Sequence, residues 1–174
     1  MMGSYFNVEY SPMVRSARWV VSDVLPRIRE AMPQIHLYIV GNGSEILKDL
    51  ESNNITVTGR VESTLPYLKH ANVALAPLQF EAAGPKYKVL EAAVCEVPIV
   101  ATPVGAEGIP AGYHKYMRVC TGAGEFASGV LEMIEKDGKA AERLREFRMH
   151  IARDFGLEQL SADGVEILRY IDAK

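Results

Sequence analysis

Residues 84–109 constrain the fold more than any other stretch, because a helix pattern and a strand pattern follow each other there directly. The spacing of apolar residues predicts a short helix from about Lys86 to Cys95. The β-branched run from Pro98 to Ala101 predicts a buried strand, and a glycine-containing turn follows it. A loop, a helix and a strand in this order are typical of parallel sheets, which bind ligands at the carboxyl ends of their strands.

The same alternation continues along the rest of the chain. Strand patterns lie at residues 1–6, 35–40, 55–58, 73–76, 98–101 and 117–120. Helix patterns lie between and after them, at residues 12–32, 44–50, 63–70, 86–95, 121–136, 139–153 and 157–171. Pro26 predicts a kink or a split in the first helix. Ser11 is the expected cap of this helix and Ser44 that of the helix that ends at about Leu50, and residues 110–115 are expected as a link. We therefore expect one α/β domain over residues 1–174, a Rossmann-like, doubly wound parallel sheet of about six strands with helices on both faces.

Composition excludes several classes of protein. The 174 residues are 48% hydrophobic and 24% charged, which is ordinary for a globular domain. The net charge is −3 and no strongly basic run occurs, so we expect no nucleic-acid partner. The apolar stretches are shorter than a membrane span, and the cysteine and histidine spacings match no metal site. Cys95 and Cys120 lie in apolar patterns, which indicates free thiols in a reducing compartment, the cytoplasm.

The central stretch carries the residues of a nucleotide site. Gly84 has no Cβ, so a ligand can approach the backbone, and the free N–H groups of the next helix turn suit a phosphate. Glu91 follows about two turns later, and its carboxylate can accept hydrogen bonds from two ribose hydroxyls. An alternative stays open, because Lys88 and Glu91 are three residues apart and could form an ordinary surface ion pair. A second glycine turn, Gly41-Asn42-Gly43, follows the strand at residues 35–40.

The order of these segments resembles the donor half of group 1 (family 4) glycosyltransferases. The central matches are Gly84, Lys88-Val89-Leu90-Glu91-Ala92, Pro98-Ile99-Val100-Ala101-Thr102 and Gly105-Ala106-Glu107-Gly108. The upstream matches are Gly3-Ser4, Val24-Leu25-Pro26, Ile39-Val40-Gly41-Asn42-Gly43, Val57-Thr58-Gly59-Arg60-Val61, Tyr67-Leu68 and Leu75-Ala76-Pro77-Leu78. The resemblance covers nearly the whole chain up to about Ile134.

The resemblance implies the second half of a two-domain enzyme with the B-type glycosyltransferase fold. That half binds a nucleotide sugar, here a UDP-, GDP- or ADP-sugar, without a metal or a further cofactor. The glutamate that matches Glu91 binds the ribose, and the backbone of the glycine loop holds the diphosphate. The segment that matches Gly59-Arg60-Val61 lies near the base. The expected nucleotide-sugar-binding residues are Gly84, Pro85, Lys86, Tyr87, Lys88, Glu91, Gly59, Arg60, Val61, Gly41 and Gly43.

The chain departs from the family pattern in three ways. Many members have a glutamate eight positions before Glu91 that contacts the transferred sugar, whereas this chain has Ala83 there and Glu81 two residues earlier. An arginine and lysine pair near the start is not found, so Lys86 or Lys88 is the candidate replacement. The acceptor half is missing, which leads us to expect an excised domain or a shortened reading frame that is inactive alone.

The expected reaction is transfer of the sugar, with retention of configuration, to a glycan or a lipid-linked acceptor, as in polysaccharide biosynthesis. Any membrane association would be peripheral and through the absent half. A stand-alone module that binds nucleotide or pairs with a separate acceptor subunit is the alternative. A sugar-nucleotide epimerase of the same fold ranks lower, because the histidines show no matching arrangement. These histidines are His36, His70, His114 and His150.

Overall fold

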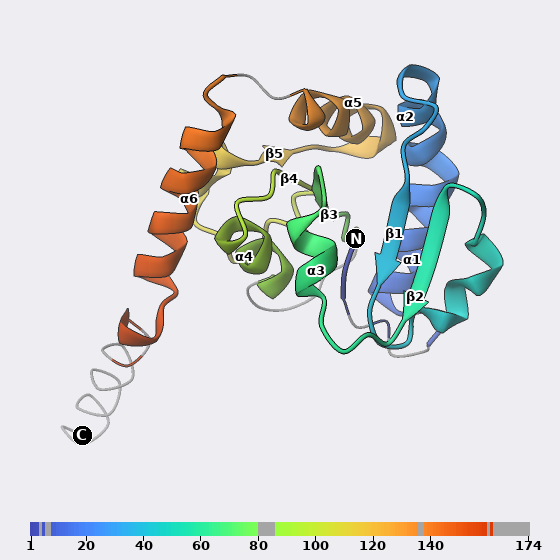
Figure 1. The fold of residues 1–174 in the computed structure, drawn as a ribbon, viewed down its shortest axis with the longest axis horizontal. Coiled ribbons are helices and arrows are strands. Elements are labelled where there is room, and N and C mark those ends of the chain that lie inside the picture. Colours follow the sequence, from blue (N-terminus) through green and yellow to red (C-terminus); the bar gives the residue numbers. More distant parts are fainter. Residues whose placement is uncertain (4, 6–7, 80–85, 136–137, 160, 162–174) are drawn as a thin grey trace.

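The computed structural model describes residues 1–3, 5, 8–79, 86–135, 138–159 and 161, and Figure 1 shows their arrangement. Five described strands form two parallel sheets. The first sheet pairs β1 (Leu37–Val40) with β2 (Ile55–Gly59). The second has β4 (Ile99–Ala101) between β3 (Ala74–Ala76) and β5 (Arg118–Val119). The predicted parallel α/β fold is confirmed.

The first residues of the chain lie between these two sheets (Figure 1). A strand was expected over residues 1–6, but the described part of it forms only an isolated parallel bridge between Met2 and Val40. The Gly3 N–H continues this contact by donating to the Val40 carbonyl oxygen at 3.1 Å. Of the six expected strands, five are therefore formed among the described residues, and the remaining one is a single bridge.

The first helical segment is split where Pro26 predicts it. It consists of α1 (Pro12–Trp19), the π-helical turn η1 (Val20–Val24) and α2 (Leu25–Ala31). Proline has no N–H and cannot donate to the carbonyl four residues earlier, so the chain widens into a π turn just before Pro26. The expected cap of α1 is also present, since Ser11 Oγ accepts a hydrogen bond from the Val14 N–H at 3.2 Å.

The remaining described helices follow the predicted positions, with two differences. They are η2 (Ser44–Leu50), α3 (Leu65–Lys69), α4 (Tyr87–Val94), η3 (Ala111–Tyr116), α5 (Gly122–Ile134) and α6 (Ala140–Asp154). Residues 110–115, expected as a link, largely form the 3₁₀ helix η3. Ser44 was expected to cap its helix, but it is the first residue of η2 and Gly43 precedes it in a left-handed conformation. No described helix is long and apolar enough to cross a membrane.

Helices cover both faces of the strands, as the side chains of β4 show by alternating between two cores. Val100 packs into a core with α1, α2 and α5, whereas Ile99 and Ala101 pack into a second core with α4 and α6. Successive side chains of a strand point to opposite faces, so β4 must contribute to both cores. Trp19 joins the first core, with its ring centroid 5.5 Å from that of Phe126.

Candidate functional site

The amino end of α4 is the first part of the candidate site. Lys86 occupies the N-cap position, and no side chain of the described residues caps the helix. The Lys86 carbonyl oxygen accepts the first helical bond from the Val89 N–H at 2.7 Å, so the Tyr87 and Lys88 N–H groups precede the helical ladder. Such groups give a helix start partial positive charge, which favours an anion. Gly84 and Pro85, the predicted loop before it, lie outside the described residues, as do Glu81 and Ala83.

Lys86 is buried and lies beside Glu107. Only 5% of the lysine is exposed, and its Nζ lies 3.4 Å from Glu107 Oε2 on the loop after β4. That loop is fixed by Thr102, whose Oγ1 accepts a hydrogen bond from the Gly105 N–H at 3.0 Å and donates to the Leu78 carbonyl oxygen. The prediction did not include Glu107 in the site, although the motif Gly105-Ala106-Glu107-Gly108 contains it.

Lys88 is the second residue of α4, and its side chain is directed toward the protein interior. Its Nζ lies 2.8 Å from Met13 Sδ. Burial, and then the nearby charge of Lys86, lower the pKa of the Lys88 ammonium from 10.5 to about 8, and Glu91 partly opposes this fall. The described ion pairs do not join Lys88 to Glu91, so the surface ion pair that the sequence left open is not formed. The Lys88 ammonium is therefore half-buried and lies near a second positive charge, that of Lys86.

Glu91 and Tyr87 lie on the outer part of α4. Both side chains are exposed, and Tyr87 retains 74% of its accessible surface. The Glu91 carboxylate is therefore open to solvent, and it is close enough to Lys88 to influence that ammonium electrostatically. Glu91 is thus an exposed acid that follows two lysines at the start of the helix. This order of residues is the one expected of a ribose acceptor next to a diphosphate site.

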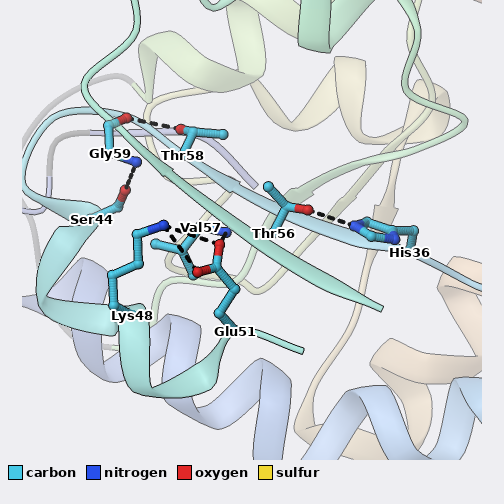
Figure 2. A network of polar contacts seen from close by, with 8 residues as sticks. All are labelled: His36, Ser44, Lys48, Glu51, Thr56, Val57, Thr58 and Gly59. Atoms are coloured by element: carbon cyan, nitrogen blue, oxygen red, sulfur yellow. Dashed lines mark hydrogen bonds and ion pairs between the residues drawn. The ribbon is translucent and has the colours of Figure 1, made fainter. Parts of the chain in front are cut away.

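The predicted glycines of the first sheet form a second group, at the carboxyl ends of β1 and β2. The Gly41 N–H donates to the Gly59 carbonyl oxygen at 3.2 Å. Ser44 Oγ accepts the Gly59 N–H at 3.0 Å, as Figure 2 shows, and Glu45 Oε1 accepts the Arg60 N–H at the same distance. Sequence reasoning missed the roles of Ser44 and Glu45, which bind the loop that contains Gly59, Arg60 and Val61 to the turn after β1.

In Figure 2 the contact between Ser44 and Gly59 lies apart from the polar contacts farther along the sheet. Lys48 contacts Glu51, which accepts the Val57 N–H at 3.2 Å. At the opposite end, His36 Nε2 lies 2.8 Å from Thr56 Oγ1. These contacts join η2 and the two strands, and they lie away from the glycine turns, so we assign them to the stability of the fold.

Gly3 connects the two groups of predicted site residues. A Cβ on Gly3 would lie 3.1 Å from Lys88 Nζ, and a Cβ on Gly41 would lie 1.9 Å from the Gly3 carbonyl oxygen. Gly41 has φ +133°, which side chains rarely allow, and Gly43 has φ +79°. The structure thus brings Lys88, Gly3 and the glycine turn together. The Arg60 side chain is exposed, and Val61 is half-buried in the second core.

The sequence comparison decides the family. A family model described as "Glycosyl transferases group 1" matches residues 8–136. The chain belongs to the group 1 glycosyltransferases. The resemblance that the motifs indicate is therefore confirmed. A comparison with curated proteins finds no match.

Solved glycosyltransferase structures share this fold. A glycosyltransferase from Rickettsia africae ESF-5 is 14% identical, with a TM-score of 0.70 over 87% of this chain. A glycotransferase of kitacinnamycin is 20% identical, with a TM-score of 0.54 over 95% of this chain. The group 1 chain spans 44% and 41% of these two proteins, so it corresponds to less than half of each.

Proposed function

We propose that this chain is the donor-binding domain of a group 1 glycosyltransferase and that it holds the diphosphate of a nucleotide sugar at the amino end of α4. The observation that carries the proposal is the placement of Lys86 and Lys88. Two lysines withdrawn from solvent repel each other beside a helix start that itself favours anions. A diphosphate would pair with both cations and accept hydrogen bonds from the N–H groups of the first turn.

The same contacts would serve the reaction as well as binding. When the bond between sugar and diphosphate breaks, negative charge develops on the leaving group. Preorganised N–H groups and lysines beside that group stabilise the developing charge without further reorganisation. The exposed Glu91 would accept the ribose hydroxyls, and the loop of Gly59, Arg60 and Val61 would lie near the base. The donor would be a UDP-, GDP- or ADP-sugar.

The complete reaction needs an acceptor half. This chain spans less than half of the solved relatives, so transfer to a glycan or a lipid-linked sugar is proposed for the whole enzyme. We propose transfer with retention of configuration and without a metal. The domain alone would bind nucleotide weakly and transfer nothing, because the groups that hold the acceptor belong to the other half.

Calorimetric titration of the chain with UDP, GDP and ADP tests the proposal. We expect at least one of them to bind, and Lys88→Met to weaken that binding at least about tenfold, since a charge-assisted contact contributes roughly 1.5–3 kcal/mol. Methionine keeps the length and packing of the lysine stem. Glu91→Gln should weaken nucleoside diphosphates but leave inorganic diphosphate unaffected.

The matched control is Lys69→Met, which removes the same charge from an exposed position of α3. It should leave the affinity unchanged. The proposal fails if none of the three nucleotides binds, or if Lys88→Met binds them as tightly as the unmodified chain does.

A further inference from the structure

Glu107 places a carboxylate at the same edge of the structure as the proposed diphosphate site. The residue lies on the loop that follows the carboxyl end of β4, and its side chain retains 56% of its accessible surface. Its Oε2 lies 3.4 Å from the Nζ of Lys86, the N-cap of α4. Among the residues that the structure describes, no hydrogen bond reaches the other carboxylate oxygen, Oε1. One oxygen thus contacts a lysine of the site, and the other is open to a ligand.

The loop that carries Glu107 is fixed against the end of β3. A Cβ on Gly105 would lie 1.9 Å from the carbonyl oxygen of Ala76, the last residue of β3, so the two backbones are in close contact there. Ala106 and Ile109 are both buried, and the Ile109 N–H donates to the Ala106 carbonyl oxygen at 3.1 Å. Because residues on both sides are anchored, the backbone of Glu107 is held in place while its side chain is exposed.

The stability of the fold alone is a weak reason for a negative charge at this position. An ion pair whose carboxylate is exposed to solvent contributes little to stability. The carboxylate of Glu107 also repels the diphosphate that the neighbouring Lys86 is proposed to bind. Glu107 therefore opposes binding of the donor unless it contacts another part of it. A carboxylate only accepts hydrogen bonds, and the hydroxyls of a sugar can donate them.

The sugar of the donor would lie beside this carboxylate. A phosphate oxygen bound to Lys86 Nζ would lie about 2.8 Å from it, so at most roughly 6 Å would separate that oxygen from Glu107 Oε2. The transferred sugar is bonded directly to the diphosphate and occupies the space next to it. Since Glu91 is the proposed partner of the ribose, the transferred sugar is the remaining source of hydroxyl donors.

We propose that Glu107 determines the specificity for the donor sugar by accepting a hydrogen bond from one of its hydroxyls, while Lys86 holds the carboxylate in place. This inference rests on the proposed nucleotide site and adds the contact with the sugar to it. The sugar must then have a free hydroxyl at the position that faces Glu107. The competing interpretation is that Glu107 only fixes Lys86, in which case its loss affects the diphosphate and the nucleotide sugar equally.

Calorimetric titration of matched ligand pairs distinguishes these interpretations. The pairs are UDP and UDP-glucose, GDP and GDP-mannose, and ADP and ADP-glucose. We expect Glu107→Ala to weaken the nucleotide sugar at least about tenfold, because a hydrogen bond to a charged group is lost. The diphosphate of the same pair should bind as before or more tightly, because a repelling charge is removed. Glu107→Gln should have a smaller effect on the sugar, since its carbonyl oxygen still accepts a hydrogen bond.

The matched control is Glu142→Ala, at an exposed position of α6, which should change neither affinity. The diphosphate, measured on the same sample, controls for folding of each variant. The inference is overturned if Glu107→Ala leaves the ratio of the two affinities unchanged, or if the unmodified chain binds a diphosphate but none of the three nucleotide sugars. If no diphosphate binds the unmodified chain, the proposed nucleotide site itself fails, and the sugar contact fails with it.

Discussion

Lys86 Nζ lies 3.4 Å from Glu107 Oε2, and the two partners differ sharply in their exposure to solvent. The lysine side chain retains 5% of its accessible surface, whereas the glutamate side chain retains 56%. The contact therefore joins a cation that has lost most of its hydration to an anion that has kept it. Because Lys86 is the N-cap of α4 and Glu107 follows β4, the pair also fixes the loop after the strand against the start of the helix.

Removing the Glu107 charge should destabilise the fold moderately. Glu107→Gln leaves Lys86 with less compensation for its burial, but solvent screens the exposed carboxylate. We expect the free energy of unfolding to fall by about 1 kcal/mol in urea titrations. Glu142→Gln, at an exposed position of α6, should change it by less than about 0.5 kcal/mol. Equal effects of the two variants would show that the contact with Lys86 contributes nothing to stability.

Lys88 should make the stability of the fold depend on pH in the alkaline range. Its pKa is about 8 in the folded chain and 10.5 ordinarily, so between these values the unfolded chain binds the proton and the folded chain does not. The free energy of unfolding should therefore rise with pH from about 8 to 10.5. Below pH 8 the charged lysine opposes folding, by about 1–3 kcal/mol.

The comparison with Lys88→Met isolates this contribution from the other titrating groups. The variant should be more stable than the unmodified chain at pH 7, and its advantage should shrink as pH increases toward 10. Urea unfolding at several pH values measures the difference, with Lys69→Met as the control for loss of one lysine charge. An advantage of Lys88→Met that stays constant over this range would contradict the buried position of the ammonium.

Much of the fold follows from local patterns, which act over a few residues. Apolar periodicity located the strands and helices, and Pro26 marked the π turn because a missing N–H changes the helix wherever it occurs. Whether residues 1–6 form a strand depends instead on the neighbouring strands with which they can pair. Its described part makes only a bridge, between Met2 and Val40, which local apolar periodicity cannot distinguish from a paired strand.

The candidate site could be predicted only in part. The lysines and Glu91 could be proposed as site residues because their motif is continuous in sequence. Glu107 was not, because its contact with Lys86 joins residues 21 positions apart. Ser44 was misassigned as a helix cap, although a serine after a glycine turn has that local signature. Its hydroxyl instead accepts a hydrogen bond from the N–H of Gly59 at the end of β2, which no local rule indicates.

Ser44→Ala should therefore destabilise the fold through the second strand. The serine is fully buried, and its loss leaves the Gly59 N–H without this acceptor. We expect the free energy of unfolding to fall by about 1–3 kcal/mol. Ser128→Ala is the matched control, because that serine is exposed in α5 and alanine favours helix there. A cost for Ser44→Ala no larger than that of the control would refute the role of the hydroxyl.

Gly41→Ala should be the most damaging of these substitutions. Gly41 has φ +133°, and a Cβ there would lie 1.9 Å from the Gly3 carbonyl oxygen. Backbone strain and this clash act together, so we expect a loss of about 3 kcal/mol or more. The clash should also separate Gly3 from the turn and move the segment that contacts Lys88. Nucleotide binding, measured calorimetrically on the fraction that remains folded, should therefore decline as well.

Gly124→Ala tests whether this effect is specific. Gly124 lies in the first turn of α5, and a Cβ there meets nothing within 4 Å. Alanine should leave stability unchanged or raise it by up to about 1 kcal/mol, since it restricts the unfolded chain. If Gly41→Ala were tolerated as well as Gly124→Ala, the Gly3 segment could not be packed against the turn after β1. The connection between Lys88 and the glycine turn would then be lost, because Gly3 is the residue that joins them.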